Sequence, residues 1–357
     1  MAKIHLVFAA LAALFMSTLA CVGQKAHDAL FGYMANSGLI LGMAQLTPSQ
    51  ARVVDPVLSS IAQGYQNSEM VANFLFPTVP VGLRGGNVIT FGKEAFMLYG
   101  SQRAPGENTK RVAFGYAGAP YALVDYSLEG VAPTEIIQEA ANGPGIDLGQ
   151  GAIVSVSAIM ALRLEKQAAD IARTAGSYAA SNKVTKSGTA QWSDITSGVS
   201  DPIADIETAK EAVRAATGKR PNTVLLGAAV MAKLRQHPKV VDRIKYTGRD
   251  VATPELLASL FGVSRVVVGD AIYSNDAGTA FTDVWGKDVI VAYTEIGSMA
   301  SNGLPSYGYT YQLNGYPMVE EPYYDRSAKS WIYPVTRVEA PVLASASAGY
   351  LITNAVA

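Results

Sequence analysis

The sequence predicts an α+β fold, and three segments carry this prediction. Residues 151–180 place apolar side chains at helical spacing, whereas strand-like stretches flank a polar, turn-rich tip at 101–110. Between about 201 and 293, short helices alternate with buried strands, which is typical of an α/β unit. A long helix, a long hairpin and a mixed unit in one chain indicate neither an all-α nor an all-β protein.

The composition is apolar for a free monomer. Hydrophobic residues make up 49% of the 357 residues and charged residues 16%, against about 25% charged in typical domains. Only the N-terminus has a membrane-like stretch, so we expect the rest of the chain to bury surface against partners. The net charge of −1 comes without any basic block, which gives no support to a dedicated nucleic-acid surface.

The first 42 residues are unlike the rest. Lys3 precedes the apolar run 4–20, and Leu19-Ala20-Cys21 resembles the lipobox of bacterial lipoproteins, which taken literally indicates a lipid-anchored envelope protein. However, MAQLTP at 43–48 reads like the beginning of a protein. We therefore expect 1–42 to be a leader-like or start-site extension, with an amphipathic helix pair as the alternative.

Before the hairpin, the sequence predicts a short helix over 47–65 and then an extended arm. Residues 70–81 are apolar but hold Pro77 and Pro80, which exclude a long helix or a central strand. Such an arm needs another surface to cover it, or it is a loop that lines the core.

The hairpin prediction rests on 87–99, 111–116 and 121–128, with Pro105-Gly106 in the tip. Because an isolated hairpin is marginal in water, it needs support, either from a neighbouring subunit or from its own core.

The helix at 151–180 has an apolar face, which consists of Ile153, Val156, Ile159/Met160, Leu164 and Ile171. Asp147 or Gln150 is the expected cap, and Gly176 lies near the end.

The α/β unit follows as a series of short elements, and residues 305–357 are strand-like. Its expected helices begin at Asp201-Pro202 and end before Gly218, then span 228–235, 240–246 and 255–261, and its strands are 223–226, 263–268 and 288–293.

Motifs for catalysis or cofactors are missing from the sequence. Gly218-Lys219 and Gly286-Lys287 lack the spacing of a phosphate-binding loop, and no Gly-x-Ser-x-Gly elbow occurs. We interpret the glycines at 143–151 as a helix-capping loop, His237 as a loop histidine, and Glu320-Glu321 as solvated charges. Asp270, after an apolar strand, is the best catalytic candidate, but it has no partner in the sequence. We expect no enzyme, no cofactor and no metal.

The order of these parts resembles the major capsid proteins of tailed bacteriophages with the Hong Kong 97-type fold. The resemblance covers about 43–357, and the stretches that carry it are MAQLTP at 43–48, SEMVANFLFPTVPV at 68–81, ITFGKEAF at 89–96, ALRLEKQAADIA at 161–172, the segment 220–246, and AGYLITNAV at 348–356.

The resemblance implies a role for each region. Its expected divisions are an N-terminal arm at 43–85, an extended β-hairpin loop at 86–130, a peripheral domain at 131–219 with the spine helix 151–180, an axial domain at 220–318, and a return to the peripheral domain at 319–357. At the hairpin tip, polar side chains are the expected contacts between subunits, although a solvated tip fits them equally: Arg103, Glu107, Lys110 and Arg111.

The implied function is assembly. Pentamers and hexamers of this subunit would form an icosahedral shell around double-stranded DNA, which they would contact non-specifically, with a portal and scaffold or decoration proteins as further partners. The protein would assemble in the host cytoplasm and reside in the virion, without a stable membrane partner. A related alternative is an encapsulin-like cellular shell.

Overall fold

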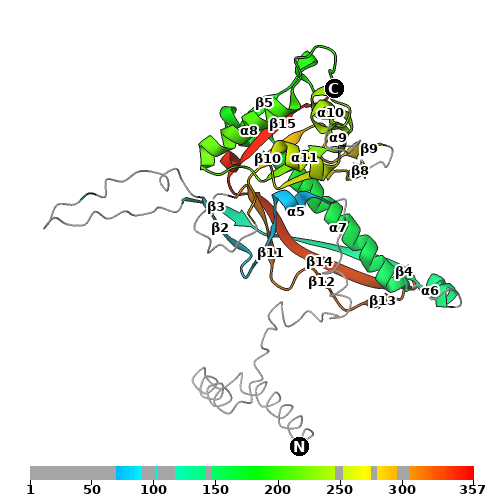
Figure 1. Ribbon diagram of the computed structural model, residues 1–357. Coiled ribbons are helices and arrows are strands. Elements are labelled where there is room, and N and C mark those ends of the chain that lie inside the picture. Colours follow the sequence, from blue (N-terminus) through cyan, green and yellow to red (C-terminus); the bar gives the residue numbers. More distant parts are fainter. Residues whose placement is uncertain are drawn as a thin grey trace, which may run out of the picture. The chain divides into compact units, whose positions relative to one another are not determined.

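The computed structural model describes residues 70–90, 102, 117–141, 147–245, 252–274, 280–295 and 306–357 (Figure 1). The leader-like segment 1–42, the expected helix at 47–65 and the four polar residues of the hairpin tip lie outside these ranges.

A six-stranded sheet is built around one long strand, β14. Its members are β1 (Thr78–Val81), β4 (Val124–Pro133), β11 (Gly308–Leu313), β12 (Met318–Val319), β13 (Tyr323–Asp325) and β14 (Ser330–Leu343). Strand β4 pairs antiparallel along one edge of β14, from Val124 opposite Glu339 to Pro133 opposite Ser330. Strands β11, β12 and β13 also pair antiparallel with β14. We call the β4–β14 pair the ribbon.

Helix α7 (Leu148–Arg173) runs along the ribbon, and α6 (Thr134–Ala141) precedes it (Figure 1). The Asp147 carboxylate caps α7 by accepting hydrogen bonds from the N–H groups of Gly149 and Gln150. The helix ends at Arg173 and does not reach 180 as expected, because Thr174 turns into an extended conformation. Short 3₁₀ turns follow at Ala175–Ser177 and Ala180–Asn182.

A second sheet has five strands in the order β5-β15-β10-β6-β7. The strands are β5 (Lys183–Thr185), β6 (Thr223–Gly227), β7 (Arg265–Gly269), β10 (Val289–Ala292) and β15 (Gly349–Thr353). Its helices are α8 (Pro202–Thr217), α9 (Ala228–Leu234), α10 (Pro238–Ile244) and α11 (Pro254–Phe261). Two of these helices are capped at both ends. Asp201 and Gly218 cap α8 as expected, and Thr253 and Gly262 cap α11, with Asp201 and Thr253 accepting hydrogen bonds from N–H groups of the first turn and the two glycines in the left-handed conformation.

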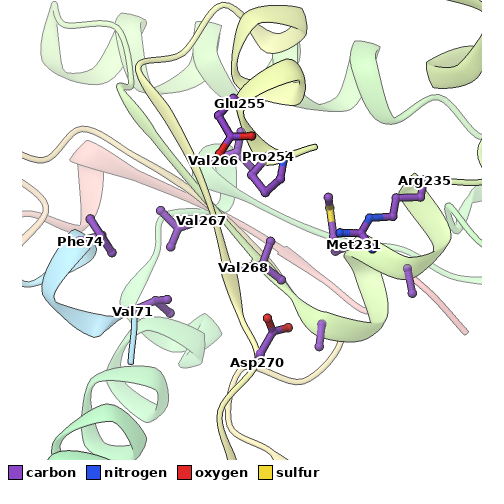
Figure 2. Close-up of a pocket in the computed structure, with 12 residues that line it drawn as sticks. Val71, Phe74, Met231, Arg235, Pro254, Glu255, Val266, Val267, Val268 and Asp270 are labelled. Carbon is purple, nitrogen blue, oxygen red and sulfur yellow. The ribbon is translucent and has the colours of Figure 1, made fainter. Parts of the chain in front are cut away.

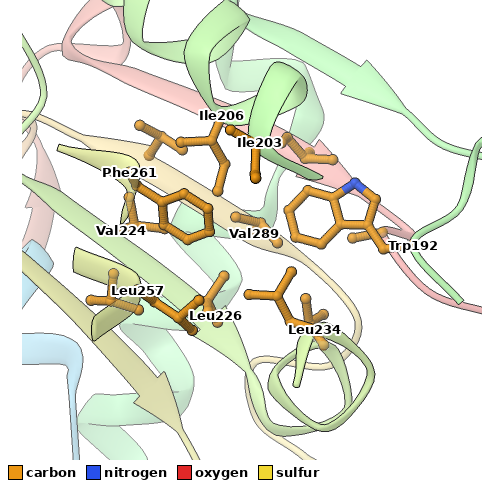
Figure 3. Packing of buried hydrophobic residues seen from close by; sticks show 14 of the residues in the cluster. Trp192, Ile203, Ile206, Val224, Leu226, Leu234, Leu257, Phe261 and Val289 are labelled. Carbon is orange, nitrogen blue, oxygen red and sulfur yellow. The ribbon is translucent and has the colours of Figure 1, made fainter. Parts of the chain in front are cut away.

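The largest hydrophobic core lies between this sheet and its helices. Trp192, Phe261 and Val289 are fully or almost fully buried there, and Figure 3 shows them packed with side chains from β6 and α8. Two 3₁₀ turns, Gly188–Ala190 and Ala346–Ala348, complete this part of the chain.

Three strands belong to another sheet than their expected ranges imply. Strand β11, inside 220–318, belongs to the six-stranded sheet, whereas β5, inside 131–219, and β15, inside 319–357, belong to the five-stranded sheet. Residues 349–352 of β15 are buried, as expected of a strand covered on both faces and paired on both edges. A pattern of apolar residues shows this burial but does not show which sheet receives the strand.

The segment expected as an arm folds onto the core. Helix α5 (Ala72–Leu75) buries Leu75 and Phe76, and β1 then pairs parallel with β11 at the edge of the six-stranded sheet. The edge position accommodates Pro80, which has no N–H to donate. The described part of this segment therefore lines its own core, which was the alternative interpretation.

Two short hairpins remain. Strands β2 (Gly85–Thr90) and β3 (Ala117–Ala122) pair antiparallel and form the described base of the expected long hairpin. Strands β8 (Ile272–Ser274) and β9 (Phe281–Asp283) form a second antiparallel pair after β7.

Candidate inter-subunit surfaces

The base of the long hairpin is fixed to the six-stranded sheet. The rings of Tyr121 and Tyr311 stack with centroids 4.2 Å apart, and Gly86 leaves room for the Tyr121 ring. Arg84 forms an exposed ion pair of 2.5 Å with Asp125 where β3 gives way to β4. The base is thereby held by its own subunit, whereas Arg103, Glu107, Lys110 and Arg111 lie beyond the described residues.

Helix α7 approaches the ribbon closely at two glycines. A Cβ on Gly149 would lie 2.7 Å from the hydroxyl oxygen of Tyr333, and one on Gly130 would lie 3.0 Å from the Cβ of Ala152. In the layer between the helix and the ribbon, Ile153, Val156 and Met160 of α7 pack against Val335 of β14. By length and composition α7 could also cross a membrane, but these contacts identify it as a core helix.

Charged groups are buried between α7 and the ribbon. Arg163 donates a 2.9 Å hydrogen bond to Glu339, and its guanidinium lies 3.1 Å from the ring centroid of Tyr126. Burial raises the pKa of Glu339, while the guanidinium groups of Arg337 and Arg163 act in the opposite direction. Burial also lowers the pKa of Arg163. The cluster fixes the helix against the ribbon at the cost of desolvating its charges.

A second buried carboxylate, Glu165, joins three parts of the chain. Its oxygens accept hydrogen bonds from the N–H groups of Val71 and Ala72 at 3.0 and 2.8 Å, and from the indole of Trp285 at 2.6 Å. Burial raises its pKa, and these three hydrogen bonds lower it. Glu165 therefore attaches α5 and the loop before β10 to α7.

Apolar side chains are exposed at the end of the ribbon. We call this group the ribbon-end patch, and its members are Val131, Ile136, Tyr323, Tyr324 and Trp331. Each is at least 40% exposed, and the rings of Tyr324 and Trp331 contact each other with centroids 5.6 Å apart. The strands beneath are held by full pairing with β14. Val131 and Tyr323 are both in register with Ile332 and share one face, whereas Tyr324 and Trp331 share the opposite face. The end of the ribbon thus exposes apolar side chains on both faces, and such exposed groups are candidates for a protein interface.

A groove lies beside β7 at the edge of the five-stranded sheet (Figure 2). Its volume is about 460 Å³, and we call it the β7 groove. Val266, Val267 and Val268 line its floor, Val71 and Phe74 lie on one side, and Met231 and Arg235 lie on the other. Asp270, which was the best catalytic candidate in the sequence, lies at one end of the groove. The groove holds one other acidic residue, Glu255, but no histidine, cysteine or serine among its lining residues, so it lacks a nucleophile and base pair.

The other candidate groups have structural roles. His237 accepts or donates a 3.2 Å hydrogen bond with the hydroxyl of Ser200, but both residues are 2% exposed and no carboxylate is bonded to the other ring nitrogen. Burial lowers the pKa of His237. Such a pair orders the loop before α10 rather than reaching a substrate. Among the described residues, no group of three potential ligands could hold a metal ion.

The comparison with known proteins shows which family this chain belongs to. The family model described as phage major capsid protein E matches residues 177–333. The major capsid protein of Burkholderia phage BcepMu is 37% identical over 310 residues, which cover 86% of this chain and 98% of that protein. This chain belongs to the phage major capsid proteins. The family is one of structural shell proteins and not of enzymes, and its members are components of the virion that associate into shells.

Other relatives agree with this assignment. The major capsid protein of Pseudomonas phage JBD67 is 31% identical over 225 residues, covering 61% of this chain and 69% of that protein. A crystallised phage-related protein from Bordetella bronchiseptica RB50 is 46% identical, with a TM-score of 0.72 over 86% of this chain and 98% of its own. The capsid protein of cyanophage P-SCSP1u is 13% identical with a TM-score of 0.52, over 81% of this chain and 89% of its own, and shares the fold. The structure is thus the mixed helix-and-strand fold of a capsid subunit.

Sequence reasoning missed several residues that matter for these surfaces. Glu165 lies in the stretch 161–172, which carries the family resemblance. No role could be assigned to it from the sequence, because its hydrogen-bond partners are 93, 94 and 120 residues away. The ribbon-end patch was also missed, although Tyr323-Tyr324 and Trp331 are a concentration of aromatic residues that a search for interface composition would have found.

Proposed function

We propose that this subunit self-assembles into the pentamers and hexamers of an icosahedral shell that encloses double-stranded phage DNA. The observation that carries the proposal is the ribbon-end patch, where five apolar side chains from β4, α6, β13 and β14 are exposed at the end of the ribbon. Burying them against other copies removes this surface from water, and many weak contacts add up over a closed shell. The relatives named as major capsid proteins support the same conclusion.

In this proposal each sheet has its own role in the shell. The six-stranded sheet with α7 serves as the peripheral domain, and the five-stranded sheet with its helices packs around the five-fold and six-fold axes as the axial domain. The hairpin that starts at β2 and β3 extends over an adjacent subunit, with Arg103, Glu107, Lys110 and Arg111 at the contact. A portal, scaffold or decoration proteins and the packaged DNA are the further partners, and assembly takes place in the host cytoplasm.

Electron microscopy of the purified full-length protein tests the proposal. Closed shells of uniform diameter are expected, and a protein that remains monomeric at every concentration contradicts it. Particles purified from infected cells should contain double-stranded DNA, whereas shells that hold protein cargo and no DNA would favour the encapsulin-like alternative. Membrane fractionation of the wild type beside Cys21→Ala tests the lipid-anchored alternative, which predicts membrane attachment that the variant loses.

Deleting residues 101–110 tests the role of the hairpin tip separately. Because the base of the hairpin is held by Tyr121 and Tyr311 within one subunit, the shortened subunit should still fold. Loss of particles with an unchanged unfolding transition is the expected result, and normal shells would contradict the tip contacts.

A further inference from the structure

His237 lies at the junction between α9 and α10 and is buried. It is the only histidine after residue 42, since the other two are His5 and His27, and it is 2% exposed. It is the N-cap residue of α10, and its carbonyl accepts hydrogen bonds from the N–H groups of Val240 and Val241, at 3.0 Å each. A displacement of His237 therefore disturbs the first turn of α10.

The ring of His237 has one hydrogen-bond partner among the described residues for its two nitrogens. Nε2 lies 3.2 Å from Oγ of Ser200, which is also 2% exposed, and Nδ1 is buried without a partner. A neutral ring can carry its proton on Nε2 and leave only a lone pair unsatisfied, whereas the protonated ring has an N–H at both nitrogens. Protonation would thus leave a buried donor without an acceptor and a buried charge without a counter-charge bonded to it. The site therefore favours the neutral ring.

A second contact joins the same two segments. The Lys239 ammonium of α10 donates hydrogen bonds to the Asp201 carboxylate at 3.0 Å and to the carbonyl of Gly198 at 3.3 Å. Of the described charged groups on α8, α9 and α10, Lys239 and Asp201 are those that act on the ring. Burial and Lys239 lower the pKa of His237, and Asp201 raises it. Because Asp201 already accepts from Lys239 and from the N–H of Ala204, it does not supply the acceptor that the protonated ring lacks.

We propose that His237 is an acid-sensitive latch, in which protonation of the ring releases the start of α10 from residues 198–201 and loosens this helix while both sheets stay folded. Helix α10 is suited to such a local opening because it is seven residues long and buries two side chains in the core, Val240 and Ile244. The latch acts within one subunit and does not require that the subunit assembles.

The direction of the pH effect distinguishes the latch from the buried carboxylates. The pKa of His237 is lowered from 6.5, so the open state binds the proton more tightly than the closed state. The stability of the latch is therefore present above about pH 6.5 and is lost as the pH falls through the lowered pKa. Burial raises the pKa of Glu165 and of Glu339, so their contribution is lost in the opposite direction, as the pH rises. A loss of stability on acidification that is confined to α10 is thus separable from both carboxylates.

Hydrogen exchange of the full-length subunit, corrected for the intrinsic effect of pH on exchange, tests the latch. Between about pH 7.5 and about pH 5, protection of residues 238–245 should fall by up to about tenfold for each pH unit below ~6.5, while protection of α7 does not fall. His237→Gln keeps a group that can bond Ser200 but cannot be protonated, so its α10 should stay protected over the whole range. His27→Gln is the matched control and should behave like the wild type.

Lys239→Met gives a second readout of the same site. Without the ammonium, Asp201 is left to stabilise the imidazolium, so the loss of α10 protection should begin at a higher pH than in the wild type. NMR titration of the wild-type ring needs no variant and should give a pKa of His237 below about 6.5. Equal loss of protection in the wild type and His237→Gln, no loss in the wild type, or a pKa of His237 at or above about 6.5 each overturns the latch. None of these outcomes depends on whether shells form.

Discussion

The carboxylate of Glu165 accepts a 2.6 Å hydrogen bond from the indole N–H of Trp285, a residue 120 positions later in the chain. Trp285 is 1% exposed, so its N–H has no access to water to replace this partner. The same carboxylate holds the N–H groups of Val71 and Ala72. One side chain of α7 thus satisfies three buried donors from two other segments.

Removing this carboxylate should destabilise the free subunit strongly. Glu165→Ala leaves three buried N–H donors without their acceptor, and each unsatisfied donor costs about 1–3 kcal/mol. We expect the free energy of unfolding to fall by about 3–5 kcal/mol in urea titration. Asp170→Ala, which removes an exposed partner of Lys166 on the same helix, should change it by about 0.5 kcal/mol or less. Similar values for the two variants would refute the role given to Glu165.

Adding a methyl group to Gly149 tests the contact between α7 and the ribbon. The new Cβ would lie 2.7 Å from the Tyr333 hydroxyl, and overpacking of this kind costs about 1–3 kcal/mol. Gly151→Ala on the same helix has open space around it and should stabilise the helix by about 0.5–1 kcal/mol. Thermal unfolding of both variants should therefore move in opposite directions from the wild type, and a shift of both in the same direction would disprove the close approach.

The buried Glu339 should give folding stability a measurable pH dependence. Its pKa is raised above 4.5 by burial, so the folded state binds its proton more tightly than the unfolded state. This contribution to stability is present at low pH and is lost as the pH rises from about 4.5 through the raised pKa. Glu339→Gln keeps the size and an acceptor for Arg163, and urea titrations between about pH 4 and pH 7 should show a flatter decline than the wild type. The exposed Glu135→Gln is the control, and an unchanged slope in Glu339→Gln would exclude this origin.

A charge placed in the ribbon-end patch should block assembly without unfolding the subunit. Val131 is 57% exposed, so Val131→Asp removes little from the core of its own subunit. In an interface, however, the carboxylate would be buried without a partner, and particle yield measured by light scattering should fall about tenfold or more. Val131→Thr keeps the shape and should assemble nearly normally. Equal yields for the two variants would show that this surface stays in water.

Helix α7 and the helices of the α/β unit were predictable from the sequence because their signals are local, whereas α5 and α6 were not expected. Asp201-Pro202 and Thr253-Pro254 mark helix starts, and Gly218 marks an end, all within a turn of the residues that they control. The predicted end of α7 near residue 180 was wrong because the apolar spacing continues past Arg173. In the structure the chain leaves the helix at Thr174, and the Tyr178 hydroxyl donates a hydrogen bond to the carbonyl of Ala172.

Sheet membership and the contact surfaces could not be predicted in the same way. The local patterns of β11 and β15 do not identify their partners, which in the folded chain are β14 and β10. Exposure of Phe281 in the β8–β9 hairpin likewise depends on Tyr273 packing against α7 from the other face of this hairpin. Local patterns predicted the α+β class, and family resemblance supplied what they could not, which was the expectation of a capsid-type fold and a capsid subunit.

Helix α7 makes the two sheets mechanically dependent on each other. At its last turn, Arg173 donates hydrogen bonds to Asp288 at 2.6 Å and to the carbonyl of Val284 at 3.0 Å, while its first turn lies under Tyr333 of the ribbon. A change in the angle between the ribbon and the five-stranded sheet therefore has to bend a 26-residue helix or break these bonds. Any rotation of one sheet against the other within a subunit is therefore resisted by the stiffness of this one helix.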